Sequence, residues 1–271
     1  MPFTTTVFGA VAPRGSDGIY IGPGGRMLFP TFDHALVAAG TLGSGHPMAP
    51  DYDYALHRRG LPTPHGQHKI IGNMESEVGY ALPDATNYVE TAISDRYLIT
   101  DSGNGRTNQF TMAAVINRTG LIPGEIIGNL QTSAISSQRI GVSTAGTLTL
   151  ACDNASETSS SITLSSSGST TSDQWEFVAG RVNGLSAKLF RRNAAQNVFV
   201  TSTGTLTLSA LGWSGNAIRV GCTRQPTPTN VGGVKIAAWA VYDKSLSDDE
   251  VSTVYDRIKT YLASMSNPIL I

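Results

Sequence analysis

Charged residues are scarce in this chain. Asp, Glu, Lys and Arg make up 14% of its 271 residues, against about 25% in an average soluble domain. The formal net charge of −1 gives no strong field of either sign, so we expect neither nucleic acid nor an anionic membrane surface as a partner. The polar surface must come instead from Ser, Thr, Asn and Gly, which are poor helix formers. This composition favours strands and turns.

Cysteine and long apolar runs are scarce too. Cys152 and Cys222 are too few for a disulfide-rich scaffold. Both lie in strand-like runs, which favours buried free thiols, while a single bridge between them stays open at this stage. No run approaches 18 apolar residues, so we expect no membrane span. Residues Met1–Thr6 lack the basic start and apolar stretch of a signal peptide, so we expect a soluble chain without a standard export signal.

Residues 1–69 differ from the rest of the chain. Eight of the thirteen prolines lie there, and glycine is also dense. Such breaker residues leave room for short strands such as Gly18–Ile21. Between them the sequence predicts one helix over Phe32–Ala39, with Thr31 as N-cap and Gly40 after its end. We interpret residues 1–69 as an extended arm or anchoring segment that becomes ordered against a partner.

From about residue 70 onward, short apolar runs alternate with turn signals. Spacings of about 8–12 residues between such runs are typical of sandwiches and jelly rolls. In Thr205–Leu208 the leucines should face the core and the threonines the solvent. The polar tract 156–173 predicts a solvated hairpin and loop, with a flexible binding loop as the alternative. The other expected strands are Asn87–Ile93, Arg96–Thr100, Gln109–Ile116, Glu125–Gly128, Arg139–Val142 and Thr147–Leu150.

The end of the chain predicts a central strand followed by a helix. Lys235–Tyr242 is too apolar for an edge strand and should be covered on both faces. Ser247 and Glu250 then form a capping box, and the helix should end near Ala263–Ser264, which leaves 266–271 as a tail. The apolar stripe of this helix consists of Val251, Val254, Tyr255, Ile258 and Leu262.

Four segments of the second half carry a recognisable pattern: Trp175–Gly184, Ala187–Phe190, Ala217–Gly221 and Gly233–Val251. Their order and spacing resemble concanavalin A-like, laminin-G-like domains, including the strand W-x-h-V-A-x-x-x-x-G and the closing segment Y-D-x-x-L-S-D-x-E. The resemblance implies an all-β fold, a concanavalin A-like antiparallel β-sandwich (jelly roll) over residues 70–265, with a C-terminal helix and an extended N-terminal arm. Trp175 and Trp239 are then expected in the core.

Patterns for catalysis are missing. Glucanases of this fold carry a strand motif E-x-D-x-(x)-E, whose carboxylates act as nucleophile and general acid. Here Glu75-Ser76-Glu77 lacks the third carboxylate, and Asp51-Tyr52-Asp53 lies in the Pro-rich segment. The sequence also has no G-x-S-x-G, H-E-x-x-H or phosphate-binding glycine loop. We therefore predict a protein that is not an enzyme.

Two groups of residues could bind a metal. Asp153 and Asn154 follow a strand and could supply calcium ligands, as many laminin-G-like domains do at the sheet rim, but calcium needs about 6–8 oxygens. A surface turn is the preferred interpretation. The histidines lack a nearby Cys or well-spaced carboxylate, so solvated loop residues are preferred over a metal site. We predict no cofactor, with calcium as the alternative. The histidines are His34, His46, His57, His65 and His68.

Trp213 is the first candidate for binding. It lies in the glycine-flanked run Leu211–Asn216, where an indole can meet a sugar ring or a protein partner. Packing over the end of the sandwich is the preferred role for this side chain. Trp213, Asn216 and Arg224 are the predicted carbohydrate- or partner-binding residues.

These observations predict a non-enzymatic structural or adhesion protein on the surface of a bacteriophage virion. The sandwich would be displayed as a decoration, fibre or receptor-binding module, and residues 1–69 would bind other virion proteins. A host surface glycan is an expected ligand, and a homo-oligomer would let weak sites act together. The step to a phage particle is analogy with phage surface proteins. The alternatives are a free glycan-binding lectin and a glucanase-like hydrolase.

Overall fold

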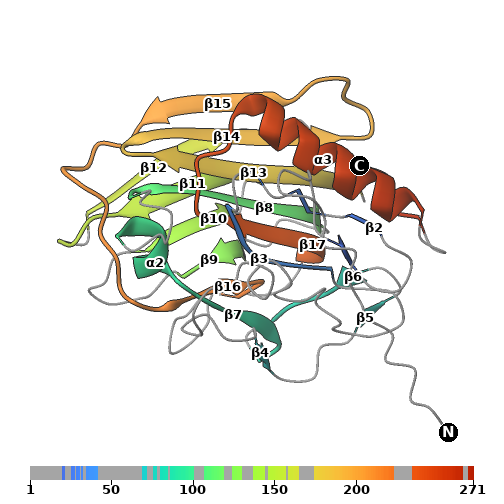
Figure 1. Ribbon diagram of the computed structural model, residues 1–271, viewed down its shortest axis with the longest axis horizontal. Helices are drawn as coiled ribbons and strands as arrows, with labels where there is room; N and C mark the ends of the chain where they lie inside the picture. The colour runs from blue at the N-terminus through green and yellow to red at the C-terminus, as the bar shows by residue number, and fades with distance from the viewer. Residues whose placement is uncertain are drawn as a thin grey trace, which may run out of the picture.

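The structure of the protein is a computed structural model, and Figure 1 shows its layered arrangement. It describes residues 20–21, 26–27, 29–30, 32, 35–41, 69–71, 76–77, 80–84, 86–100, 107–118, 124–129, 137–143, 146–156, 158–164, 174–222, 234–264 and 268–271. All five histidines and Arg224 lie outside these residues, so their predicted roles stay predictions.

Two antiparallel sheets pack face to face, which confirms the predicted β-sandwich. The seven-stranded sheet consists, in spatial order, of β12 (Ser159–Leu164), β11 (Leu148–Asp153), β10 (Gln138–Val142), β9 (Gly124–Gly128), β16 (Ala217–Val220), β7 (Tyr88–Ser94) and β4 (Lys69–Ile71). The eight-stranded sheet consists of β15 (Val200–Thr205), β14 (Ser186–Asn193), β13 (Trp175–Asn183), β8 (Gln109–Arg118), β17 (Val234–Tyr242), β6 (Tyr80–Ala81) and β5 (Ser76–Glu77), with β3 (Leu36–Thr41) also paired to β17. Strands β1 (Tyr20–Ile21) and β2 (Arg26–Met27) pair with each other.

The core follows from the alternation of side chains along each strand. In β12 every second side chain is buried, so Ile162 and Leu164 face the core while the intervening Ser and Thr residues face solvent. Leu206 and Leu208 are likewise buried, although β15 ends at Thr205. Strand β17 is buried along nearly its whole length and lies between β8 and β3, so the prediction of a central strand is confirmed.

The C-terminal helix α3 (Asp248–Ala263) lies on the outer face of the eight-stranded sheet (Figure 1). The predicted capping box is present, since Ser247 Oγ accepts a hydrogen bond from the Glu250 amide and the Glu250 carboxylate accepts one from the Ser247 amide. The predicted stripe is buried, and the Tyr255 ring lies 5.6 Å from that of Phe177. Residues 268–271 pack back on the helix: the Tyr255 hydroxyl donates to the carbonyl of Ile271. No helix among the residues described is long and apolar enough to cross a membrane.

The helix predicted over Phe32–Ala39 is wrong, because Leu36–Thr41 forms strand β3. Its Ala238↔Thr41 to Tyr242↔Leu36 pairing with β17 buries both faces of the segment and overrides its local helix propensity. A Cβ on Gly40 would lie 2.8 Å from the indole nitrogen of Trp239, so this close approach requires glycine. Part of the predicted arm is thus a strand of the sandwich.

A second prediction is also wrong, since Arg96–Thr100 was expected to be a strand. The segment forms helix α2 (Asp95–Ile99), which Ser94 caps by accepting a hydrogen bond from the amide of Tyr97. A short apolar run has no decisive periodicity, and Ser-Asp at its start is a helix N-terminus signal that outweighs the β propensity.

Two of the tryptophans lie in different layers of the structure, and both cysteines are buried. Trp239 is fully buried in the core between the two sheets, as predicted. Trp175 is only partly buried, on the α3 side of the same sheet, with its ring 5.1 Å from that of Tyr80. Trp175, which was expected in the core, therefore packs only at the edge of the apolar cluster beneath α3. Cys152 and Cys222 are both buried, and no disulfide joins them. Burial raises the pKa of Cys222 to about 11 and raises that of Cys152 further.

Candidate functional site

The candidate site is the Trp213 loop, residues Leu211–Asn216, which connects β15 to β16. In Figure 1 this segment is orange and passes α2 at one end of the sandwich. Leu211 and Gly212 are buried, whereas Trp213 is 42% exposed. The following Gly215 has a φ of 78°, a left-handed conformation that favours glycine. The loop therefore begins with two buried residues and exposes the large side chain of Trp213 directly after them.

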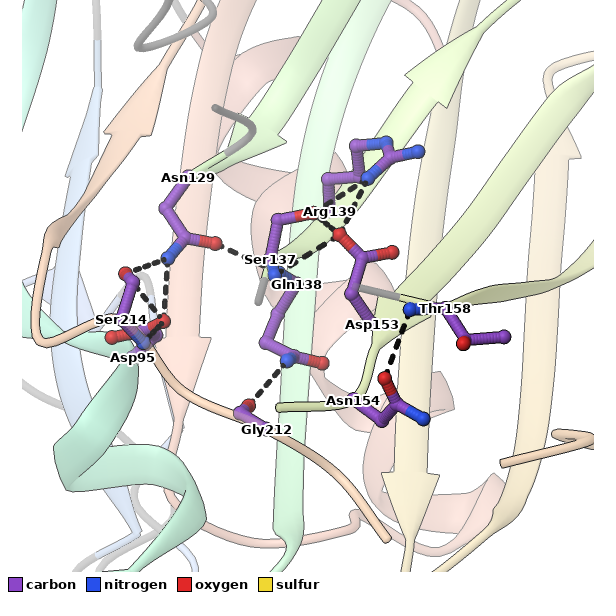
Figure 2. A network of polar contacts seen from close by, with 10 residues as sticks. All are labelled: Asp95, Asn129, Ser137, Gln138, Arg139, Asp153, Asn154, Thr158, Gly212 and Ser214. Atoms are coloured by element: carbon purple, nitrogen blue, oxygen red, sulfur yellow. Dashed lines mark hydrogen bonds and ion pairs between the residues drawn. The ribbon is translucent and has the colours of Figure 1, made fainter. Parts of the chain in front are cut away.

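A buried carboxylate holds this loop in place (Figure 2). Asp95, the first residue of α2, is fully buried. Its Oδ2 accepts hydrogen bonds from the amide and hydroxyl of Ser214, at 2.7 and 2.8 Å, and from Asn129 Nδ2 at 2.7 Å. Its Oδ1 accepts from the amide of Gly215 at 2.8 Å, and its own amide donates to the carbonyl of Asn216. Charge-assisted bonds of this kind are stronger than neutral ones, so they fix the backbone on the C-terminal side of Trp213.

The N-terminal side of the loop is fixed by the seven-stranded sheet (Figure 2). Gln138 Nε2 donates to the carbonyl of Gly212 at 3.0 Å, and the amide of Gly212 donates to the carbonyl of Asp153 at 2.9 Å. The backbone N–H of Gln138 donates to Asn129 Oδ1 at 2.7 Å. Since Asn129 also donates to Asp95, this bond connects the Gln138 contacts with the hydrogen bonds around Asp95. Trp213 is therefore held between two anchored residues, and little loop entropy remains to be lost when a partner binds.

The indole itself is held by a neighbouring cation. The guanidinium of Arg96, in α2, lies 4.7 Å from the centre of the Trp213 ring, a cation–π contact. The sequence prediction preferred packing over the sandwich end, with contact to a sugar or a protein partner as the alternative. Trp213 packs against Arg96 and stays 42% exposed, and both roles stay predictions.

The other predicted binding residue of this loop is Asn216. It is half-buried, its amide donates to Ser214 Oγ, and its side chain makes no hydrogen bond with the part of the chain that the structure describes. Trp213 and Asn216 thus lie on one fixed loop. Arg224, the third residue of the predicted set, lies outside the described residues.

Asp153 and Asn154, the candidate calcium ligands, are engaged within the protein (Figure 2). Asp153 Oδ2 accepts from the Ser137 amide and lies 3.7 Å from Arg139 Nη1. Asn154 Oδ1 accepts from the amides of Ser156 and Thr158, both at 2.9 Å, which is a turn. No three His, Cys, Asp or Glu side chains gather into a possible metal site within the described ranges. Calcium binding here stays a prediction.

Glu176 is a buried carboxylate outside this loop, and two neighbouring arginines explain its burial. Glu176 lies 2.7 Å from Arg118 Nη2 and 3.8 Å from Arg191 Nε, so it joins strands β13, β8 and β14 through an ion cluster. Burial raises the pKa of Glu176 and the two guanidinium groups oppose this effect. The cluster is a cross-strand contact in the sheet, and the absence of enzymatic activity stays a prediction.

No protein-family model and no curated protein sequence matches this chain. Several solved structures share its fold. The botulinum neurotoxin type G receptor binding domain matches with a TM-score of 0.56 at 10% identity, over 85% of this chain and 52% of that chain. The chain shares the antiparallel β-sandwich fold of this structure.

Two further solved structures are similar to this sandwich. A structure of botulinum neurotoxin type C has a TM-score of 0.51 at 12% identity, over 70% of this chain and 46% of that chain. The Trypanosoma rangeli sialidase has a TM-score of 0.54 at 13% identity, over 89% of this chain and 36% of that chain. The chain therefore spans about half the length of the toxin chains that it matches. At such low identity the similarity shows the fold alone.

Proposed function

We propose that this protein is a non-catalytic recognition module that binds a glycan through the Trp213 loop. The observation that carries the proposal is the exposed indole of Trp213 on a loop that Asp95 and Gln138 fix from both sides. Tryptophan offers a large, rigid contact area with few rotatable bonds, so its ordering on binding costs little entropy. A binding site that is ordered in advance keeps more of its contact energy as affinity.

The chemistry of the loop suits a sugar. The apolar face of an indole can pack against the C–H face of a pyranose ring, and the nearby amide of Asn216 can donate to and accept from its hydroxyls. The structural neighbours agree with this choice: the type G toxin domain is a receptor binding domain, and cell entry of the type C toxin depends upon interaction with two ganglioside molecules. These statements concern the toxins and support the proposal for this chain by analogy.

Replacing Trp213 with Ala should weaken glycan binding by about thirtyfold, the size of a binding hot spot. A glycan array first identifies the ligands of the wild-type protein, and titration calorimetry then compares the two proteins on the best ligand. Because Trp213 is partly exposed, the free energy of unfolding should fall by only about 1 kcal/mol, the size of the lost cation–π contact with Arg96.

Val198→Ala is the matched control, since Val198 is 71% exposed and apolar but lies outside the Trp213 loop. It should leave the affinity unchanged. Equal binding by wild type and Trp213→Ala would exclude the loop as the glycan site, and a protein that binds no glycan on the array would exclude the function.

We also propose, separately, that the module is displayed on a bacteriophage particle and attached through its N-terminal segment. The sequence pattern of residues 1–69 supports this proposal. Because β3 belongs to the sandwich, a test by deletion must spare it. A chain lacking residues 1–18 keeps every described strand, since the first begins at Tyr20, and it should be missing from purified particles. Its incorporation at full occupancy would exclude attachment through these residues.

A further inference from the structure

A polar groove lies on the outer face of the eight-stranded sheet, beside the N-terminus of α3. Its volume is about 430 Å³, within the usual range for small-molecule sites. Helix α3 covers the neighbouring part of this face. Ser247 and Glu250, at the start of the helix, line the groove. None of the residues of the Trp213 loop lines it.

The floor of the groove consists of residues that strand pairing places side by side. Arg181 in β13 pairs with Lys188 in β14, and Lys188 pairs with Thr203 in β15. Asn183 pairs with Ser186 one step further along the same two strands. Residues two apart on a strand share a face, so these side chains form two adjacent rows across the sheet. The opposite wall is the segment Lys244–Ser247 with Glu250 of the first helical turn.

The charged side chains beside the groove form ion pairs within the protein, three bases with two carboxylates. Asp248 bridges two cations, with Oδ1 2.9 Å from Arg181 Nη1 and Oδ2 2.6 Å from Lys188 Nζ. The hydrogen bond from Lys188 lowers the pKa of Asp248, so this carboxylate is ionised at neutral pH. Lys244 Nζ is likewise 2.6 Å from Glu250 Oε1. Both carboxylates are already paired, and the three bases exceed them by a single charge, so neither a cation nor an anion meets a large net charge of opposite sign.

Neutral polar groups fill the gaps between the ion pairs. Their side chains make no hydrogen bond with any residue that the structure describes, although each can both donate and accept. They are Asn183, Ser186, Thr203 and Ser245.

We propose that this groove binds a neutral, hydroxyl-rich ligand, such as an uncharged sugar residue. A hydroxyl group donates to a carboxylate or amide oxygen and accepts from an ammonium, guanidinium or amide, so vicinal hydroxyls match a surface of alternating donors and acceptors. Such a ligand needs no change in the charge state of the groove. The site is separate from the Trp213 loop and adds a second place of contact to the same module.

Titration of the ¹⁵N-labelled full chain with monosaccharides tests the proposal. The probes are glucose, galactose, mannose and N-acetylglucosamine at millimolar concentrations, with glucuronate and glucosamine as charged counterparts. At least one neutral sugar should shift the backbone amide signals of Asn183–Ser186 and Ser245–Ser247 saturably, and each charged counterpart should bind more weakly. Asn183→Ala should weaken this binding about tenfold, because it removes hydrogen bonds to the ligand.

A matched pair on one strand supplies the control. Thr203→Val removes a hydroxyl from the groove, whereas Thr201→Val removes one from the same exposed side of β15 outside it. Only the first should weaken binding. The proposal is overturned if no neutral sugar shifts these amides, if glucuronate or glucosamine binds more tightly than every neutral sugar, or if the two threonine variants behave alike.

The Trp213→Ala variant separates this site from the function proposed above. The shifts of the groove amides should persist in that variant, because no residue of the Trp213 loop lines the groove. If Trp213→Ala retains full affinity on the array while the groove still binds sugar, the proposal for the Trp213 loop fails and the proposal for the groove stands.

Discussion

Replacing Asp95 with Ala is expected to lower the free energy of unfolding by about 4 kcal/mol. The carboxylate is fully buried and accepts hydrogen bonds from Ser214, Gly215 and Asn129. Asp95→Ala leaves these donors facing a cavity, and a buried donor without an acceptor costs its full desolvation penalty. Urea unfolding followed by far-ultraviolet circular dichroism measures the change.

The matched control is Asp84→Ala. Asp84 also accepts four hydrogen bonds, from the amide and hydroxyl of Thr86 and from the amide and side chain of Asn87, at distances of 2.6–2.9 Å. That turn is open to solvent, so water can replace the lost acceptor and the cost should stay near 1 kcal/mol. Similar losses for Asp95→Ala and Asp84→Ala would contradict the view that Asp95 is a buried anchor.

Asp95→Ala is also expected to weaken glycan binding. Trp213 is unchanged in Asp95→Ala, yet the loop that presents it loses its anchor on one side. Under conditions where the variant stays folded, glycan binding should therefore fall although no residue that contacts the glycan has been altered. Full affinity in the folded variant would mean that the order of the loop is not required.

Replacing Trp239 with Ala is expected to cost about 4 kcal/mol. The indole is fully buried between the sheets, and its removal leaves a cavity that the flanking strands cannot close. Trp175→Ala is the comparison: the Trp175 side chain is only partly buried on the outer face of the same sheet, so its loss should cost less. Equal costs would contradict the placement of Trp239 in the core.

A double-mutant cycle with Gly40 tests the contact between β3 and this indole. In the wild type Gly40→Ala should destabilise the protein by about 2 kcal/mol, because the new Cβ collides with the ring of Trp239. In the Trp239→Ala protein the cavity accepts the methyl group, so the same change should cost little. Additive effects would mean that residues 36–41 do not pack on β17.

Local signals explain which parts of the fold could be predicted. The capping box of Ser247 and Glu250 lies within four residues of sequence, and the stripe of α3 repeats at helical spacing, so both were predictable. The apolar run of β17 showed that both of its faces are covered. The residues Leu36–Thr41 carried a misleading helix signal. The pairing that overrides it could not be read from local sequence, because the partner strand lies about 200 residues later in the chain.

The candidate site was predictable only in its exposed part. Glycines around Trp213 marked a turn that presents an aromatic side chain, and this signal is local. The anchor was missed: Asp95 is 119 residues from Ser214 in sequence. Asn129 directly follows β9, and Gln138 is the first residue of β10. Single Asp, Asn and Gln residues near strand ends have no pattern that distinguishes a buried network from a surface turn.

The measurement that tests the central claim most directly is an NMR titration that follows the three tryptophan indole N–H signals. Trp213→Phe assigns the Trp213 signal, and the ligand is the best glycan from the array. The proposed function predicts a saturable shift of the Trp213 signal, while the signals of Trp175 and Trp239 stay in place. An unchanged Trp213 signal at saturating glycan would contradict it.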